Sequence, residues 1–328
     1  MSVPEIRYCP GTLKEGCSTY STTCLNRVFN GHRVHHILPY SSPATNEETD
    51  DQFSENRKYI SISGVQEKFS MLLVKNKLRL IREGEQGTYI LKPIPGAGKN
   101  AGEMPANEHL TMQIARQVFK LETAENALIF FKNGDAAYLT KRFDVKEDGS
   151  KRAQEDFASL AGRTPQTHGE HYKYQGNYLE LFELMRIHLP AYRLEAPKLF
   201  KLLAFNYLFS NGDAHFKNFS LIETPLGDFR LSPAYDLLNS RIHIEDKDFA
   251  LEAGLLPGNL AGGKVRQQFE TLAHHAGLSE KQVNDIFMLL TSETAGVSSL
   301  VKASFLSEKI QRNYWQAYLT RLKKLTQS

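Results

Sequence analysis

Cysteine is scarce in this sequence, and long apolar runs and a large excess of charge of either sign are missing. The chain has three cysteines in 328 residues, and we interpret them as ordinary reduced thiols of a cytosolic protein. No apolar run is long enough to cross a bilayer, and the first residues lack the apolar centre of a signal peptide. The formal net charge of +3 is too small to indicate nucleic acid or a membrane surface as the main partner. We therefore expect a cytoplasmic protein that binds neither directly.

The three cysteines lie near the N-terminus and are followed by three histidines. Zinc prefers Cys and His ligands, so the cluster is compatible with a structural metal site. It contains no close Cys-x-x-Cys pair, however, which favours thiols without a metal. The sequence leaves this question open for Cys9, Cys17, Cys24, His32, His35 and His36.

The apolar pattern divides the chain into a β-rich part followed by a helical part, which indicates an α+β fold. The sequence has no internal repeats or low-complexity runs, and its length suits one large or two medium domains. Apolar runs between turns predict strands at 69–74, 78–81, 88–92, 126–131 and 136–140. Helical spacing predicts helices at 106–120, 178–188, 198–210, 280–290 and 308–325. The expected parts are an N-terminal segment packed on or flanking the first lobe, a β-rich N-lobe and a helical C-lobe, over 1–56, 57–142 and 143–328.

The strongest chemical signal is the run Asn211-Gly-Asp-Ala-His-Phe-Lys-Asn-Phe-Ser220, with Asp236 a short strand-like stretch later. Protein kinases use the pattern Asp-x-x-x-x-Asn in the catalytic loop and a separate Asp for magnesium. In this interpretation Asp213 takes the proton of the attacking hydroxyl, while Asn218 and Asp236 hold the metal ions. Asn-Gly-Asp is also a common turn sequence, because Gly and Asn tolerate left-handed backbone angles.

Two earlier features suit the binding of nucleotide phosphates. The run Ser61-Ile-Ser-Gly-Val-Gln-Glu-Lys68 has small residues that let backbone N–H groups approach phosphate oxygens. A plain entry to a hairpin explains the same run equally well. Lys92 ends a predicted strand, and Glu108 begins the next predicted helix. Kinases require such a strand lysine with a helix glutamate as its partner, although a solvated Lys beside a helix-start Glu is the alternative.

Two charged stretches flank the change from strands to helices. Lys141-Arg-Phe-Asp144 could bond an adenine edge through its backbone, with Asp144 near the ribose, or it could be a charged strand end. Gln154-Glu-Asp156 precedes a predicted helix start, where acidic residues are favoured by the helix dipole. A role of Glu155 in organising the site is a second interpretation.

These motifs, taken in order, resemble those of the HipA-type serine/threonine kinases, which are toxins of bacterial toxin–antitoxin systems. The resemblance covers roughly residues 57 to 250 and is far more specific than any one motif. Its motifs are Ser61–Lys68, Tyr89-Ile-Leu-Lys92-Pro, Asn107-Glu108, Lys141-Arg-Phe-Asp144, Gln154-Glu-Asp156, Asn211–Ser220 and Leu231-Ser-Pro-Ala-Tyr-Asp236.

The resemblance implies a two-lobe, protein-kinase-like fold, with ATP and Mg²⁺ as cofactors. It implies Asp213 as the catalytic base, Asn218 and Asp236 as metal ligands, and Glu108 and Glu155 as supporting residues. Ser61 and Ser63 would be autophosphorylated. The nucleotide-binding residues would be Ser63, Gly64, Val65, Gln66, Glu67, Lys68, Lys92, Lys141, Arg142, Phe143, Asp144, His215 and Tyr235.

Only 56 residues precede the motif-bearing part, which is similar to the short HipT-type branch of the family. That branch implies a HipS-like small antitoxin and a HipB-like DNA-binding antitoxin as partners. It also implies an aminoacyl-tRNA synthetase as substrate, the tryptophanyl enzyme first and the glutamyl enzyme second, with growth arrest as the outcome. The alternatives are a kinase of lipids or small molecules, and a catalytically silent corepressor scaffold.

Overall fold

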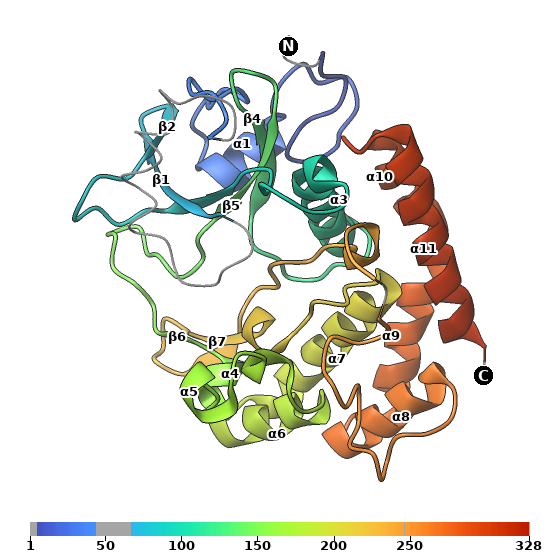
Figure 1. The fold of residues 1–328 in the computed structure, drawn as a ribbon. Coiled ribbons are helices and arrows are strands. Elements are labelled where there is room, and N and C mark those ends of the chain that lie inside the picture. Colours follow the sequence, from blue (N-terminus) through green and yellow to red (C-terminus); the bar gives the residue numbers. More distant parts are fainter. Residues whose placement is uncertain (1–4, 44–66, 246, 328) are drawn as a thin grey trace. The chain divides into compact units, whose positions relative to one another are not determined.

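The computed structural model describes residues 5–43, 67–245 and 247–327 (Figure 1). The chain forms two compact units, and each is described by itself. Unit 1 comprises 1–113, 124–150 and 299–311, and unit 2 comprises 114–123, 151–298 and 312–328. The linear boundaries expected from the sequence, at 56 and 142, stay predictions. No helix among the described residues is both long and apolar enough to cross a membrane.

Unit 1 is built on a five-stranded antiparallel sheet in the order β2-β1-β3-β5-β4. In β1 the alternate residues Phe69 and Met71 are buried, as expected for a strand with one face in the core. The strands are β1 (Phe69–Val74), β2 (Lys77–Leu80), β3 (Tyr89–Lys92), β4 (Asn126–Phe130) and β5 (Ala136–Lys141). All five strands predicted from the sequence are therefore confirmed.

The connection between β4 and β5 follows the Asn-Gly signal of the sequence. Gly134 has a φ of 92°, a value that glycine adopts without steric cost. The N–H groups of Phe131 and Gly134 donate to the carbonyls of Asp135 and Phe131, at 2.8 and 2.9 Å. This turn fixes the register in which Phe130 pairs with Ala136.

Described residues of the N-terminal segment, from Cys9 to Leu38, complete the hydrophobic core of unit 1. Their helix α1 (Thr22–Phe29) is capped by the Ser21 side chain. Val28 and Phe29 pack in one cluster with sheet residues such as Leu91. The N-terminal segment also extends the sheet edge, since Phe130 N–H donates to His36 O at 2.8 Å and Leu38 N–H donates to Phe130 O at 2.7 Å. Such pairing covers the otherwise open edge of β4.

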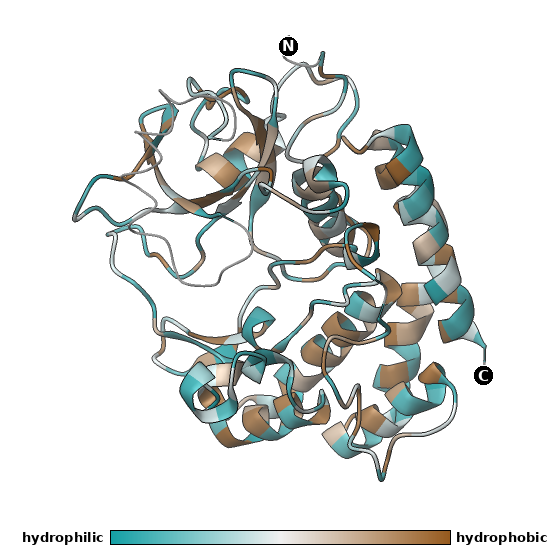
Figure 2. Cartoon of the chain, viewed as in Figure 1, coloured by the Kyte–Doolittle hydropathy of each residue, from teal (hydrophilic) through white to brown (hydrophobic). Residues whose placement is uncertain are grey.

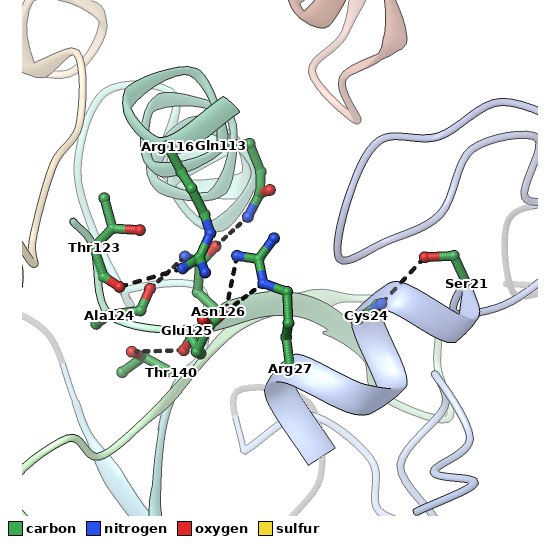
Figure 3. A network of polar contacts seen from close by, with 10 residues as sticks. All are labelled: Ser21, Cys24, Arg27, Gln113, Arg116, Thr123, Ala124, Glu125, Asn126 and Thr140. Atoms are coloured by element: carbon green, nitrogen blue, oxygen red, sulfur yellow. Dashed lines mark hydrogen bonds and ion pairs between the residues drawn. The ribbon is translucent and has the colours of Figure 1, made fainter. Parts of the chain in front are cut away.

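An ion pair ties α1 to the start of β4. Arg27 reaches from the helix to Glu125, with 2.9 Å between Nη2 and Oε2 (Figure 3). Next to it the buried Gln113 side chain donates to Asn126 Oδ1 at 2.9 Å. Helix α1 was not expected from the sequence, because the N-terminal residues were interpreted as a turn-rich segment.

The helix predicted at 106–120 is found as α3 (Met104–Gln117), which follows the 3₁₀ turn η1 (Ala101–Glu103). Leu110 and Ile114 lie on its apolar face and are fully buried. This helix carries Glu108, which is considered below.

Unit 2 is mainly helical, and α7 (Tyr192–Leu208) is its central element. Eleven residues of α7 are buried, and Figure 2 shows it largely in brown. The predicted helices at 178–188, 198–210, 280–290 and 308–325 are confirmed as α6 (Leu179–His188), α7, α9 (Glu280–Ser292) and α11 (Glu308–Thr326). Unit 2 also has α4 (Phe157–Leu160), α5 (Pro165–His168), η2 (Tyr172–Tyr174), η3 (Phe216–Asn218), η4 (Ser240–Ile242) and α8 (Val265–Ala276), and α10 (Thr294–Ala303) starts in it.

A small antiparallel sheet in the order β6-β7-β8 completes unit 2. Its strands are β6 (Gln154–Asp156), β7 (Ser220–Glu223) and β8 (Phe229–Leu231). The segment from Asn211 to Phe219 connects α7 to β7, and it is called the catalytic loop below after the kinase loop that its Asp-x-x-x-x-Asn motif resembles. The sheet therefore helps to position both ends of the motif, because Asp236 follows β8 after the short stretch 232–235.

Candidate functional site

The catalytic loop begins with a sharp reversal at the end of α7. Ser210 has a φ of 53°, which lies in the left-handed region that L-residues rarely adopt. The N–H of Asn211 donates to Asn206 O at 2.8 Å, and its Nδ2 donates to Asn206 Oδ1 at 3.0 Å. Helix α7 and the loop thus form one hydrogen-bonded unit.

The structure brings Asn218 and Asp236 together. Asn218 Nδ2 lies 3.4 Å from Asp236 Oδ2, and the Asn218 Oδ1 accepts from His215 N–H at 3.0 Å. Asp236 has a φ of 55°, an unusual backbone angle of the kind that clusters at functional sites. Asp213 lies in the same loop and is half-buried.

These side chains fit a magnesium ion. Mg²⁺ takes oxygen ligands and is usually held by one or two carboxylates together with substrate phosphates and water. The Asp236 carboxylate and the second lone pair of the Asn218 amide oxygen supply such ligands. Among the described residues no group of three or more His, Cys, Asp or Glu side chains could hold a metal ion by itself, so nucleotide phosphates and water would have to complete the donor set.

His215 and Tyr235 have different surroundings. His215 is 7% exposed, and its Nδ1 has no hydrogen-bond partner. Burial lowers the pKa of His215 to about 4, so the ring is a neutral polar group. The hydroxyl of Tyr235 donates to Lys217 O at 3.0 Å and lies 2.5 Å from Ser220 Oγ. Tyr235 therefore braces the catalytic loop against β7.

Three contacts to the catalytic loop were missed by sequence reasoning. Tyr174 Oη donates to Asp213 Oδ1 at 2.7 Å, and Tyr178 Oη donates to Ala214 O at 2.7 Å. Asp156 forms an ion pair with Lys217 at 2.8 Å. The only sequence signal for the two tyrosines is an aromatic cluster within a polar stretch.

Asp156, and not Glu155, is the acidic residue of β6 that contacts the catalytic loop. Side chains alternate along a strand, so Gln154 and Asp156 share the face toward Ser220 and Lys217, whereas Glu155 is exposed. Asp156 also caps α4 by accepting from Ser159 N–H at 2.9 Å. Within the part of the chain that the structure describes, no such contact between Glu155 and the catalytic loop supports the role that was expected of Glu155.

In unit 1 Lys92 and Glu108 form a buried ion pair. Lys92 Nζ lies 2.7 Å from Glu108 Oε1, and their side chains are 5% and 4% exposed. The ring of Tyr138 lies 5.3 Å from Lys92 Nζ. Strand β3 and helix α3 thus hold the lysine in one position, as a kinase-type phosphate contact requires.

The segment expected to bond adenine uses part of its backbone in the sheet. Lys141 N–H donates to Glu125 O at 2.7 Å, and Arg142 N–H donates to Thr88 O at 2.9 Å. These two N–H groups are therefore not available to an adenine edge. Arg142 and Asp144 form an ion pair with 2.9 Å between Nε and Oδ1. Phe143 is half-buried.

Most of the expected phosphate loop lies outside the described residues. This applies to Ser61, Ser63, Gly64, Val65 and Gln66. Glu67 is exposed and Lys68 is half-buried, and both directly precede β1. The N-terminal cysteines are free thiols, two of them buried.

Residues 60–296 match the family model of the HipA-like C-terminal domain. The chain belongs to this family. All the proposed site residues of the HipA-like domain, from Ser61 to Asp236, fall within the matched range.

Two curated relatives of the HipA-like domain carry kinase names. This chain is 31% identical over 265 residues to a Sinorhizobium fredii protein named "Putative kinase Y4dM", and the match covers 77% of this chain and 62% of the relative. It is 25% identical over 232 residues to a "Putative kinase" of Haemophilus influenzae, which covers 69% of this chain and 64% of the relative. The chain thus spans about three-fifths of their length.

Two solved structures share the fold. Shewanella oneidensis HipA, in a complex with HipB and its operator DNA, has a TM-score of 0.62 at 18% identity, covering 81% of this chain and 64% of that one. The Helicobacter pylori proinflammatory kinase CtkA has a TM-score of 0.52 at 14% identity, covering 77% and 92%. These matches confirm the expected α+β, HipA-like kinase fold.

Proposed function

We propose that this HipA-like domain is an ATP- and Mg²⁺-dependent serine/threonine protein kinase that acts as a toxin. The observation that carries the proposal is the contact of Asn218 with Asp236, with Asp213 in the same loop as Asn218. The buried pairing of Lys92 with Glu108 supports it independently. Family membership and the kinase names of the relatives agree with it.

In the proposed reaction Asp213 accepts the proton of the acceptor hydroxyl as the oxygen attacks the γ-phosphorus of ATP. The bond from the γ-phosphorus to the bridging oxygen breaks, and ADP leaves with that oxygen. Lys92 would bind the nucleotide phosphates, and Asn218 and Asp236 would hold magnesium, which when bound would neutralise charge on the phosphate oxygens. Positioning and charge stabilisation supply nearly all of the catalysis.

Three finer proposals follow from the resemblance. The substrate is an aminoacyl-tRNA synthetase, tryptophanyl first and glutamyl second. The partners are a HipS-like small antitoxin and a HipB-like DNA-binding antitoxin, as in the HipT-type branch. The complex of Shewanella HipA with HipB supports the second partner, and co-purification of each small protein with the tagged chain tests both.

Self-phosphorylation of Ser61 and Ser63 is proposed as the regulation of this kinase. Each phosphate adds about −1.5 to −2 charges, which repel the phosphates of a bound nucleotide. The modified chain is therefore expected to bind ATP more weakly than the unmodified chain.

The test is mass spectrometry of the wild type, Asp213→Asn and Asp285→Asn after incubation with ATP and magnesium, followed by labelled-ATP transfer to purified synthetases. Asp285 is an exposed residue of α9 and serves as the matched control. We expect phosphate in the wild type and the control and none in Asp213→Asn. Equal labelling of Asp213→Asn would refute the assignment of the base. Labelling of lipids or small molecules instead of protein would favour that class of kinase, and no transfer at all would favour a silent scaffold.

A further inference from the structure

Tyr174 forms a hydrogen bond to one carboxylate oxygen of Asp213, the proposed catalytic base. Its hydroxyl donates to Asp213 Oδ1 at 2.7 Å, and its ring meets the ring of His215 edge-on with 5.1 Å between centroids. Both partners belong to the catalytic loop, whereas Tyr174 lies 39 residues earlier in the chain. The contact is therefore made by tertiary structure and not by the motif.

Groups outside the catalytic loop hold the backbone around Tyr174. Glu252 N–H donates to Tyr174 O at 2.9 Å, and Tyr174 N–H donates to His171 O at 2.9 Å. Arg163 donates to Gln175 O at 2.6 Å and forms an ion pair with Glu180. These contacts fix the tyrosine before any substrate binds. The entropy cost of orienting the Asp213 carboxylate is therefore small.

Arg163 also links this segment to the catalytic loop. Its guanidinium lies over the ring of Phe216, 4.3 Å from the centroid. Arg163, Tyr174 and Tyr178, all from the segment that leads into α6, thus contact the loop. A shift of that segment would move the carboxylate of Asp213 together with it.

The chemistry of the contact suits a fixed hydrogen-bond donor. Burial, together with the neighbouring Asp213 carboxylate, raises the pKa of Tyr174, so the phenol keeps its proton at neutral pH. A carboxylate has two oxygens and accepts several hydrogen bonds. With Oδ1 engaged by Tyr174, the rotation of the Asp213 side chain is restrained and Oδ2 can accept from the substrate.

We propose that Tyr174 is a positioning residue that holds Asp213 in the orientation needed to accept the proton of the substrate hydroxyl. This inference rests on the proposed kinase function. Tyr174 acts through Asp213 and does not exchange a proton in the reaction.

The test compares Tyr174→Phe with Tyr192→Phe. Both changes remove one hydroxyl that makes a 2.7 Å hydrogen bond, but the Tyr192 bond goes to Ala276 O, between α7 and α8. Initial rates of phosphoryl transfer from labelled ATP, to the chain itself and to added casein, are measured over a range of ATP concentrations. Thermal unfolding is measured in parallel.

We expect Tyr174→Phe to lower the rate at saturating ATP about 10- to 100-fold, because a small misplacement of a reacting group has effects of this size. The KM for ATP should stay within about twofold of the wild type, and the melting temperature should match that of Tyr192→Phe. In an Asp213→Asn background the same change should have no further effect on residual transfer, since the two residues act as a unit.

A rate for Tyr174→Phe equal to that of Tyr192→Phe would overturn the inference. A faster rate would also overturn it, because it would mean that the Tyr174 hydrogen bond hinders Asp213 from accepting the proton. A rate loss accompanied by an equal change in KM or in melting temperature would indicate a structural role only. In each of these cases the wild type transfers phosphate and the proposed function survives. No transfer by the wild type would remove the proposed function and this inference with it.

Discussion

Lys92 and Glu108 keep two opposite charges almost fully away from water. Taking charges out of water is costly, and the pair is tolerated because each side chain is neutralised by the other. Strand β3 ends at the lysine, and α3 presents the glutamate from its second turn. At the scale of single residues we therefore expect this pair to be sensitive to substitution.

Glu108→Gln should lower the free energy of unfolding by about 3–5 kcal/mol, because it leaves a buried ammonium without its counter-charge. The pair formed by Arg230 and Glu122 offers a matched control, since those side chains are 36% and 52% exposed. Glu122→Gln should cost about 1 kcal/mol or less. Urea unfolding of the two variants measures the difference. Equal effects would mean that the buried pair has no special role, and partial recovery in Lys92→Met/Glu108→Gln would support the charge argument.

Helix α11 holds the turn that starts the catalytic loop. Arg321 is 1% exposed, donates to Ser210 Oγ at 3.3 Å and to Lys247 O at 3.1 Å, and forms an ion pair with Asp248. Ser210 O in turn accepts from Ser240 Oγ at 2.9 Å, and Ser240 Oγ accepts from Gly212 N–H at 2.8 Å. At the scale of elements, the last helix of the chain thus supports the loop that carries Asp213.

Arg321→Met should slow phosphoryl transfer and lower stability by about 1.5–3 kcal/mol, the usual worth of a hydrogen bond to a charged group. Lys324→Met is the control on the same helix, because Lys324 is 50% exposed in its side chain and lies 3.5 Å from the same Asp248. Transfer rates with labelled ATP and thermal unfolding check both. If the two variants behave alike, α11 does not support the loop.

The burial of His36, His109 and His215 makes the stability of the whole molecule depend on pH. Burial lowers the pKa values of His36, His109 and His215 to about 4 each, against about 6.5 in an unfolded chain. Below pH 6.5 the unfolded chain therefore binds more protons than the folded one, and stability falls as the pH decreases toward 4. Above about pH 6.5 these histidines contribute no pH dependence.

His109→Gln should flatten this decline between about pH 6.5 and pH 4, because it removes one buried titrating group from α3. His274→Gln, at an exposed position of α8, is the control. The melting temperature of each variant, measured in steps of pH, is compared with that of the wild type. A slope for His109→Gln as steep as that of the control would contradict the prediction.

The sequence by itself determined the local elements and the motif. Strand alternation, helical spacing and the Asn-Gly turn depend on neighbours a few residues away, so the strands of unit 1 and helices such as α3 and α9 were predictable. Asp213, Asn218 and Asp236 were also visible, because their chemistry needs fixed residue types at short spacings. The proposed nucleotide and metal roles of these residues stay predictions.

Only the tertiary structure decided which distant groups hold those residues. The bond from Tyr174 to Asp213 spans 39 residues, and the bond from Arg321 to Ser210 spans 111. Helix α1 forms where its apolar side can join the core of unit 1, although its sequence has weak helical preference. On β6, Asp156 and not Glu155 contacts the catalytic loop, because strand geometry selects the face. Such contacts follow from the path of the backbone through space, which the spacing of residues along the chain does not encode.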